Sequence, residues 1–223
     1  MPVIPSVIVR DRDNSSGEID KSKLLLVEGK DETLFFEAFF KKNEHLNGQL
    51  GGDIQIIEMG GVDKFKTELP ALINRTGFSD KVESIAIIRD ADNNFESAFQ
   101  SICAILNRHG LPHPTEHSTY SSRNNLKVGI FVMPGNSEGG TMLEDLCLRT
   151  QIDNPIMNCV NSFFSCLEGI DIEMPRNIAK AKSQVFLAAM PKIVSSLGIG
   201  ANKGYWDLNH DSLMGLSNFL VDL

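Results

Sequence analysis

Three aliphatic runs in the first half of the chain each end at a polar or glycine-containing turn and lead into a segment with helical spacing. The runs occupy 23–27, 54–59 and 84–88, and the segments that follow occupy 31–42, 62–74 and 94–108. Runs that are apolar on both faces are typical of parallel strands buried between helices. Repeated units of strand, turn and helix therefore predict a parallel sheet with helices on both faces.

A fourth aliphatic run, 128–133, follows a segment at 109–125 that is rich in Pro, Ser, His and Asn and that we expect to be irregular. The N-terminal residues predict at most a short strand at 7–9. Further helices are expected at 141–148, 154–168, 178–197 and 211–222. No strand is expected beyond Thr150.

The predicted fold class is therefore α/β, with a Rossmann-like, mostly parallel central sheet of about four strands flanked by helices. We expect two parts. Residues 1–150 form the α/β domain, and residues 151–223 form a helical C-terminal extension packed on it.

The charge balance limits the partners that the chain can bind. Its 223 residues include 21 basic and 29 acidic side chains, a net charge of −8 with neutral histidine. This balance argues against nucleic-acid attraction by the whole surface, because phosphate binding normally requires a basic surface. A polyanionic partner needs either a divalent metal held by carboxylates or a local basic stretch. Residues 175–206 are such a stretch, since they lack acidic residues and contain Arg176, Lys180, Lys182, Lys192 and Lys203.

Other features predict a cytoplasmic protein without a membrane anchor. The longest apolar runs fall far short of the roughly 20 residues that span a bilayer, and 1–14 lacks the pattern of a signal peptide. The cysteines form no CxxC pair, so we expect buried, reduced thiols. They are Cys103, Cys147, Cys159 and Cys166. Trp206 precedes an apolar helix and is expected in the core, with stacking on a base as the alternative.

Acidic residues follow three of the predicted strands. They are Glu28 and Asp31 after the first, Asp90 and Asp92 after the third, and Glu138, Glu144 and Asp145 after the fourth. Ligands of open parallel sheets bind at the carboxyl ends of the strands. If the third strand continues, Asp90 and Asp92 point the same way, and they lie beside Glu28 if the first and third strands are neighbours.

Two interpretations of these acids remain open. Asp31 and Asp92, taken singly, occupy positions where acids cap helices. Taken together, three converging carboxylates repel one another, and a divalent cation is the natural compensation. Oxygen-only ligands favour Mg²⁺, Mn²⁺ or Ca²⁺ over Zn²⁺.

Two motifs resemble the signatures of the Toprim domain. They are Leu-Leu-Leu-Val-Glu-Gly-Lys-Asp at 24–31 and Ile-Ala-Ile-Ile-Arg-Asp-Ala-Asp at 85–92. Topoisomerases, DnaG-type primases, OLD-family nucleases and RecR proteins share that domain. The resemblance implies that Glu28 is a metal ligand or an acid/base, and that Asp90 and Asp92 are ligands of Mg²⁺ (or Mn²⁺) used in phosphodiester chemistry.

Further segments are similar to the compact, stand-alone Toprim-like proteins grouped as DUF3226, so the resemblance spans nearly the whole chain. These segments are 130–136, 139–146, 180–182, 185–190 and 204–223. The late Leu-Glu pair at 143–144 and a late lysine resemble features of OLD-type nucleases, which implies roles for Glu144 and Lys182.

A two-metal mechanism needs additional acidic ligands, and the sequence offers several. We expect Asp31 and Glu144 to complete a second site, with Asp145 or Glu138 as alternatives. Glu144 and Asp145 point about 100° apart on a helix, so one of them faces the site. Lys182 is the candidate for neutralising charge at the scissile phosphate. Substrate phosphates are expected at Gly29, Lys30, Gly61 and Lys180.

The predicted function is Mg²⁺-dependent hydrolysis of phosphodiesters in DNA or RNA. Two alternatives stay open: a non-catalytic, RecR-like binding or regulatory module, and a primase-like nucleotidyl transferase subunit. Because the chain is acidic, a partner protein that helps to hold the substrate is a further expectation. Nucleotide hydrolysis through a Walker loop is excluded, because 135–140 lacks the Gly-Lys-Ser/Thr ending.

Overall fold

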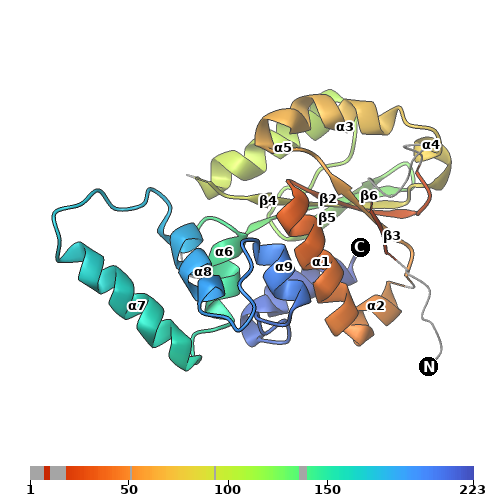
Figure 1. Cartoon of the computed structure of the whole chain (residues 1–223). Coiled ribbons are helices and arrows are strands. Elements are labelled where there is room, and N and C mark those ends of the chain that lie inside the picture. Colours follow the sequence, from red (N-terminus) through yellow and green to blue (C-terminus); the bar gives the residue numbers. More distant parts are fainter. Residues whose placement is uncertain (1–7, 11–18, 51, 93, 136–139) are drawn as a thin grey trace, which may run out of the picture.

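The computed structural model describes residues 8–10, 19–50, 52–92, 94–135 and 140–223. Six strands form one sheet in the order β1-β3-β2-β4-β6-β5 (Figure 1). The strands are β1 (Ile8–Arg10), β2 (Lys23–Val27), β3 (Ile54–Glu58), β4 (Ser84–Asp90), β5 (Thr119–Arg123) and β6 (Leu126–Met133). Neighbouring strands are parallel except β5 and β6, which are antiparallel. The mostly parallel α/β sheet is confirmed, with more strands than the four predicted.

The expectation of an irregular segment at 109–125 is confirmed for 109–118 and wrong for 119–123, where β5 forms the sheet edge. Arg123 pairs with Leu126, so a two-residue turn joins β5 to β6. Both turn residues have positive φ, 51° at Asn124 and 65° at Asn125. Asn tolerates this left-handed conformation, which two-residue hairpin turns require. The strand Thr-Tyr-Ser-Ser-Arg is polar because it lies at an edge, and so it lacks an aliphatic run.

Helices cover both faces of the sheet in two groups (Figure 1). One group is α3 (Phe65–Ile73), α4 (Phe78–Lys81) and α5 (Phe95–Arg108), with the 3-10 turn η2 (Val62–Lys64) before it. The other contains α1 (Lys30–Lys42), α2 (Glu44–Gln49), α6 (Leu143–Arg149), α8 (Ile178–Ala188), α9 (Leu197–Asn202), η3 (Asp211–Leu213) and α10 (Met214–Val221). The helix α7 (Pro155–Glu168) projects from this second group.

Each face of the sheet has its own hydrophobic core. Strand alternation sends Ile87 toward the α5 side and Ile88 toward the α1 side. The α1 side includes Phe35 together with Phe186 and Trp206 from beyond residue 150. The helices after residue 150 therefore share a core with the sheet.

Trp206 is in the core, as predicted. Its side chain is buried, it stacks on Phe186 with ring centroids 4.9 Å apart, and its indole N–H donates to the Leu197 carbonyl at 3.0 Å. The helix predicted at 178–197 is wrong in its length. It ends at Ala188, and α9 begins at Leu197, because Pro191 between them cannot continue a helix.

Among the described residues, no helix is both long and apolar enough to cross a membrane. All four cysteines are free. Cys103 and Cys147 are buried as predicted, but the prediction is wrong for Cys159 and Cys166, which are exposed on α7.

Candidate active site

The strand order places the two acidic motifs side by side. β2 and β4 are neighbours in the sheet, and β3 lies on the other side of β2. The helix that follows β2, α1, packs on one face of the sheet, whereas α5, which follows β4, packs on the other. When the helices that follow two neighbouring parallel strands pack on opposite faces of the sheet, a crevice opens at the carboxyl ends of those strands. Ligands of α/β proteins bind in such crevices.

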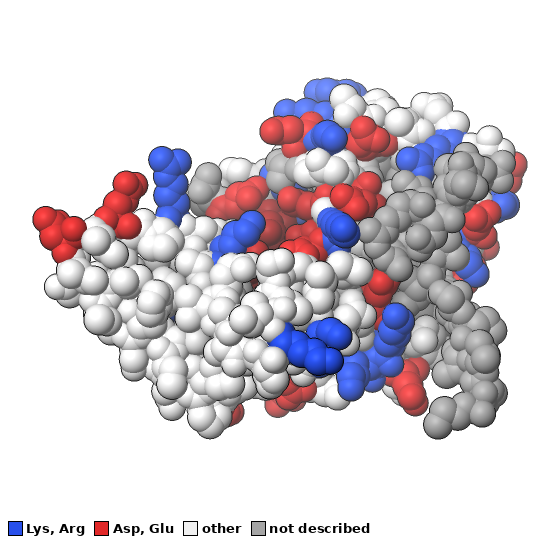
Figure 2. Space-filling view, viewed as in Figure 1, with Lys and Arg blue, Asp and Glu red and all other residues white. Residues whose placement is uncertain are grey.

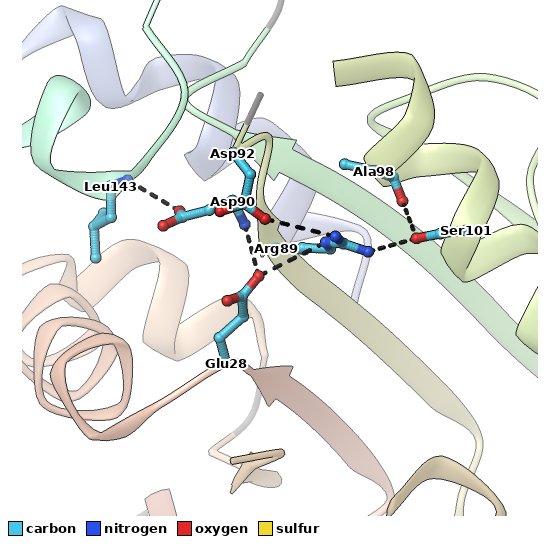
Figure 3. Close-up of polar contacts among 7 residues, drawn as sticks. All are labelled: Glu28, Arg89, Asp90, Asp92, Ala98, Ser101 and Leu143. Carbon is cyan, nitrogen blue, oxygen red and sulfur yellow. Dashed lines mark hydrogen bonds and ion pairs between the residues drawn. The ribbon is translucent and has the colours of Figure 1, made fainter. Parts of the chain in front are cut away.

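Glu28 and Asp90 meet at this crevice, as the sequence predicted for neighbouring strands (Figure 3). Oε1 of Glu28 accepts a hydrogen bond of 3.1 Å from the backbone N–H of Asp90. The Asp90 carboxylate accepts a bond of 3.1 Å from the N–H of Leu143, the first residue of α6. Both carboxyl groups are thus held by backbone donors on one side of the sheet edge.

Burial and mutual repulsion shift the proton affinities of both acids. Burial raises the pKa of Glu28 to about 7, and the negative charges of Asp92 and Glu32 add to the rise. Burial also raises the pKa of Asp90 well above its usual value, with the charges of Glu28, Glu32 and Glu144 acting in the same direction. The site therefore concentrates negative charge that the protein only partly neutralises.

Asp92 does not point the same way as Asp90, which corrects the expectation from the sequence. The strand ends at Asp90, and Asp92 adopts a left-handed conformation with φ of 52°. The amides of Ala91 and Asp92 both donate to the Thr141 carbonyl, at 2.7 and 3.1 Å. This turn breaks the alternation of side chains, so the rule for a continuing strand does not apply.

Arg89 belongs to the second motif and pairs with one acid of each motif (Figure 3). Its Nε is 3.8 Å from Oε1 of Glu28, and its terminal nitrogen is 3.6 Å from Oδ2 of Asp92. The guanidinium also bonds to the hydroxyl of Ser101, which donates to the Ala98 carbonyl of α5 at 2.8 Å. Arg89 is thus fixed to α5 and compensates part of the negative charge.

Glu32 is an acidic residue of this site that sequence reasoning missed. Burial raises the pKa of Glu32, and the charges of Glu144 and Asp31 add to the rise. A Cβ on Gly29 would lie only 3.2 Å from Oε2 of Glu32, so the glycine leaves room for this carboxylate. The available signal was its position in the first turn of α1, four residues after Glu28.

The acids of α6 have different environments. Asp145 accepts hydrogen bonds from the amides of Thr141 and Met142, at 2.8 and 3.2 Å, and so caps its own helix. Burial raises the pKa of Glu144, while Lys180 opposes this rise and Asp31 adds to it. Of the two, the charge of Glu144 is the one that acts on Asp90. Glu138 lies outside the described residues.

Asp31 is close enough to influence Glu32 and Glu144, but its carboxylate already has a partner. Oδ1 of Asp31 accepts a hydrogen bond from the hydroxyl of Ser196, the N-cap residue of α9. Asp31 therefore ties α1 to α9 as well as contributing charge to the site.

The two candidate lysines face different ways. Lys180 is near enough to Glu144 to lower its pKa. Lys182, predicted beside the scissile phosphate, instead donates to Oδ1 of Asn161 on α7 at 2.9 Å and lies 5.7 Å from the ring centre of Phe164. Residues two apart on a helix point in different directions, so both cannot serve one site.

The two glycines that were predicted to bind phosphate, Gly29 and Gly61, take part in hydrogen bonds within the protein. Gly61 has φ of 106°, and its N–H donates to the Glu28 carbonyl at 2.9 Å, so this amide is not directed at a ligand. Gly29 is the N-cap of α1, and its carbonyl accepts bonds from the amide and the hydroxyl of Thr33. Lys30 is exposed at the first turn of α1.

The surface has a hollow in which acidic side chains gather, with basic side chains at its margin (Figure 2). A cleft of about 430 Å³ adjoins the site, between the 140–145 turn and the start of α8. Its lining includes Asp92, Thr141, Arg176 and Asn177. Within the described ranges, no three Asp, Glu, His or Cys side chains are close enough together to form a ready-made metal site.

These features define an α/β protein with an acidic site at the switch point of a mostly parallel sheet. The chain belongs to the family DUF3226, described as a protein of unknown function, which matches residues 22–223. Comparisons with curated proteins and with solved structures found no match.

Proposed function

We propose that this protein is a Toprim-type, divalent-metal-dependent phosphodiesterase that cleaves DNA or RNA. The observation that carries the proposal is the meeting of Glu28 and Asp90 at the switch point, where burial and the charges of neighbouring acids raise the pKa of both. Such partly compensated carboxylates favour the binding of a cation. The resemblance of the 24–31 and 85–92 motifs to Toprim signatures supports the same chemistry.

The donor chemistry of the site fits Mg²⁺ or Mn²⁺, because the acids present only oxygen ligands. Asp90 and Glu28 would hold the ion, with Glu32 and Glu144 as the nearest additional donors. These side chains must draw closer together on binding, since none of the described acids form a closed ligand set. When bound, such an ion polarises a phosphoryl oxygen and lowers the pKa of water.

The role proposed for Asp92 changes with its position. Asp92 would join the ligands only by leaving Arg89, 3.6 Å away, so we place Glu32 ahead of it in the proposed set. Asp31 remains an outer contributor through its charge.

Glu28 also has the properties of an acid/base. Because its pKa is about 7, Glu28 populates both its protonated and its ionised form at neutral pH, which suits proton transfer. Lys180, which acts on Glu144, is the cation proposed to meet a substrate phosphate, and Lys30 stands exposed at the first turn of α1. Lys182 has no part in this proposal because it contacts α7.

The decisive experiment incubates the purified protein with labelled single- and double-stranded DNA and RNA, in Mg²⁺, Mn²⁺ or EDTA. We expect cleavage that EDTA abolishes and that Asp90→Asn reduces by roughly 100-fold or more. Asp80→Asn, an exposed residue on α4, is the matched control and should retain activity. No cleavage of any substrate with either metal, or full activity of Asp90→Asn, would contradict the proposal.

A second candidate is a non-catalytic, RecR-like module that binds nucleic acid. The ion pairs of Arg89 favour it, because they partly compensate Glu28 and Asp92 without a metal. This candidate predicts nucleic-acid binding without turnover in the same assay, and binding that Asp90→Asn leaves unchanged.

A further inference from the structure

The helix α7 carries apolar residues on two sides. Its inner side includes Met157, Val160 and Phe164, which are buried. The helix packs against α8, and Lys182 of α8 lies over the ring of Phe164. These contacts attach α7 to the rest of the protein, together with the partly buried Ile156 and Leu167.

The outer side of α7 has a second apolar stripe that remains exposed. Within the helix it consists of Cys159, Phe163 and Cys166, and exposed isoleucines lie beyond the two ends at Ile152 and Ile170. Cys159, Phe163 and Cys166 are four and three residues apart, which is the spacing of a helix that packs against another helix. Ile152 is 70% exposed, Ile170 is 53% exposed and Phe163 is 47% exposed.

The charge distribution favours a second copy of this chain as the occupant. The chain has a net charge of −8, so two copies repel one another over most of their surface. α7 is different, because Glu168 is the one charged residue in its sequence. The lower left of the space-filling view, where α7 lies in Figure 1, is correspondingly free of basic and acidic colour over a broad area (Figure 2).

The outer stripe of α7 is self-complementary when two copies of the helix lie antiparallel. Cys159 and Cys166 lie equally far from the point between residues 162 and 163, on either side of Phe163. In an antiparallel pair of α7 helices, Cys159 would therefore face the partner subunit's Cys166, with the two Phe163 rings at the centre. A two-fold interface requires such a self-complementary surface.

We propose that two copies of this protein associate through the outer stripe of α7, antiparallel about Phe163. A helix of 14 residues is about 21 Å long. The flanking Ile152 and Ile170 extend the contact toward the roughly 800 Å² per partner that stable interfaces bury. Acidic residues at the rim, Asp153, Glu168 and Asp171, repel across the pair, so salt strengthens the dimer.

The first test measures molar mass by sedimentation over a range of protein concentrations. The wild type should shift from monomer to dimer as concentration rises, and the shift should occur at lower concentration in high salt. Phe163→Glu should stay monomeric, while Ile193→Glu, at a residue that is 75% exposed outside α7, should dimerise like the wild type. A wild type that stays monomeric, or a Phe163→Glu variant that dimerises normally, overturns the proposal. Thermal unfolding checks that both variants are folded.

The second test uses the exposed thiols and needs no activity assay, so it is independent of the proposed function. A short bismaleimide should cross-link the wild type into a dimer. Cys159→Ser and Cys166→Ser should each abolish cross-linking, because each removes one member of both antiparallel pairs. The double variant reports the background from the buried Cys103 and Cys147. Cross-linking that survives in either single variant, or that is absent in the wild type, overturns the antiparallel arrangement.

Discussion

The backbone N–H of Asp90 donates to Oε1 of Glu28 at 3.1 Å, and this bond joins the ends of β4 and β2. It fixes one carboxylate directly beside another, in a place where Glu32 and Glu144 add further negative charge. Binding of protons or of a cation relieves such repulsion, so protonation of these acids and cation binding both affect the stability of the fold.

Lowering the pH should stabilise the protein through Glu28. Its native pKa of about 7 lies above the ordinary value of 4.5, so the native state binds more protons than the unfolded state between these values. Stability therefore decreases as pH rises through this window and is lowest, for this group, above pH 7. Glu28→Gln keeps an acceptor for Asp90 and should raise the free energy of unfolding at pH 8 by about 2 kcal/mol.

Urea unfolding at pH 5 and pH 8 measures this difference. The buried acid Asp90 acts in the same direction as Glu28, so Glu28→Gln should reduce the pH dependence without removing it. Glu58→Gln, exposed at the end of the neighbouring strand β3, serves as the control and should leave the pH dependence unchanged. An unchanged pH dependence in Glu28→Gln would show that this carboxylate is not destabilising.

Glu32 should contribute to metal binding if the proposed function is correct. Its carboxylate is half-buried and acts on both Glu28 and Asp90 through its charge. We expect Glu32→Gln to weaken Mn²⁺ binding by roughly 10-fold or more. The measurement is the rise of the melting temperature with Mn²⁺ concentration, which reports affinity through linkage. Glu116→Gln, an exposed acid far along the chain, should bind Mn²⁺ like the wild type, and equal affinities for both variants would remove Glu32 from the ligand set.

Substitutions of Lys180 and Lys182 should have different effects: the first should weaken substrate binding, and the second should lower stability slightly. Lys180→Ala removes the cation near Glu144 and should weaken the binding of an oligonucleotide and reduce the salt dependence of that binding by about one charge. Lys182→Ala loses its contacts with Asn161 and Phe164, which should cost below about 1 kcal/mol of stability. Fluorescence anisotropy in the Asp90→Asn background measures binding without turnover. If Lys182→Ala weakened binding and Lys180→Ala did not, the roles assigned to the two lysines would have to be exchanged.

The sequence was sufficient to place Glu28 and Asp90 together. Aliphatic runs mark strands buried on both faces, and parallel strands carry the residues that follow them to one edge of the sheet. The position of Asp92 was not predictable in this way, because a single left-handed residue changes the direction of a side chain without altering hydrophobic periodicity.

Other features depended on contacts between distant segments. Glu32 reaches the site because α1 starts at Lys30, and helix ends are the part of a sequence pattern that is least well defined. The choice between Lys180 and Lys182 was set by how α8 packs between α6 and α7. β5 lacked an aliphatic run because it is a polar edge strand, although Asn124 and Asn125 carried the signal of a hairpin turn.

Gly198 should be essential for the packing of α9 on α1. A Cβ at this position would lie 2.4 Å from the Asp31 carbonyl oxygen and 2.5 Å from Cβ of Leu34, so the backbones must separate to admit it. We expect Gly198→Ala to lower the free energy of unfolding by about 2–3 kcal/mol, because overpacking of a buried contact forces backbone shifts. Gly215→Ala in α10 is the matched control: nothing lies within 4 Å of its added Cβ, so it should be neutral or stabilising by about 0.5–1 kcal/mol. Chemical unfolding of both variants tests this contrast. Because Asp31 also bonds to Ser196 at the start of α9, separation of the two helices should alter the acidic site as well. Equal stability of the two variants would mean that α1 and α9 do not make this close contact.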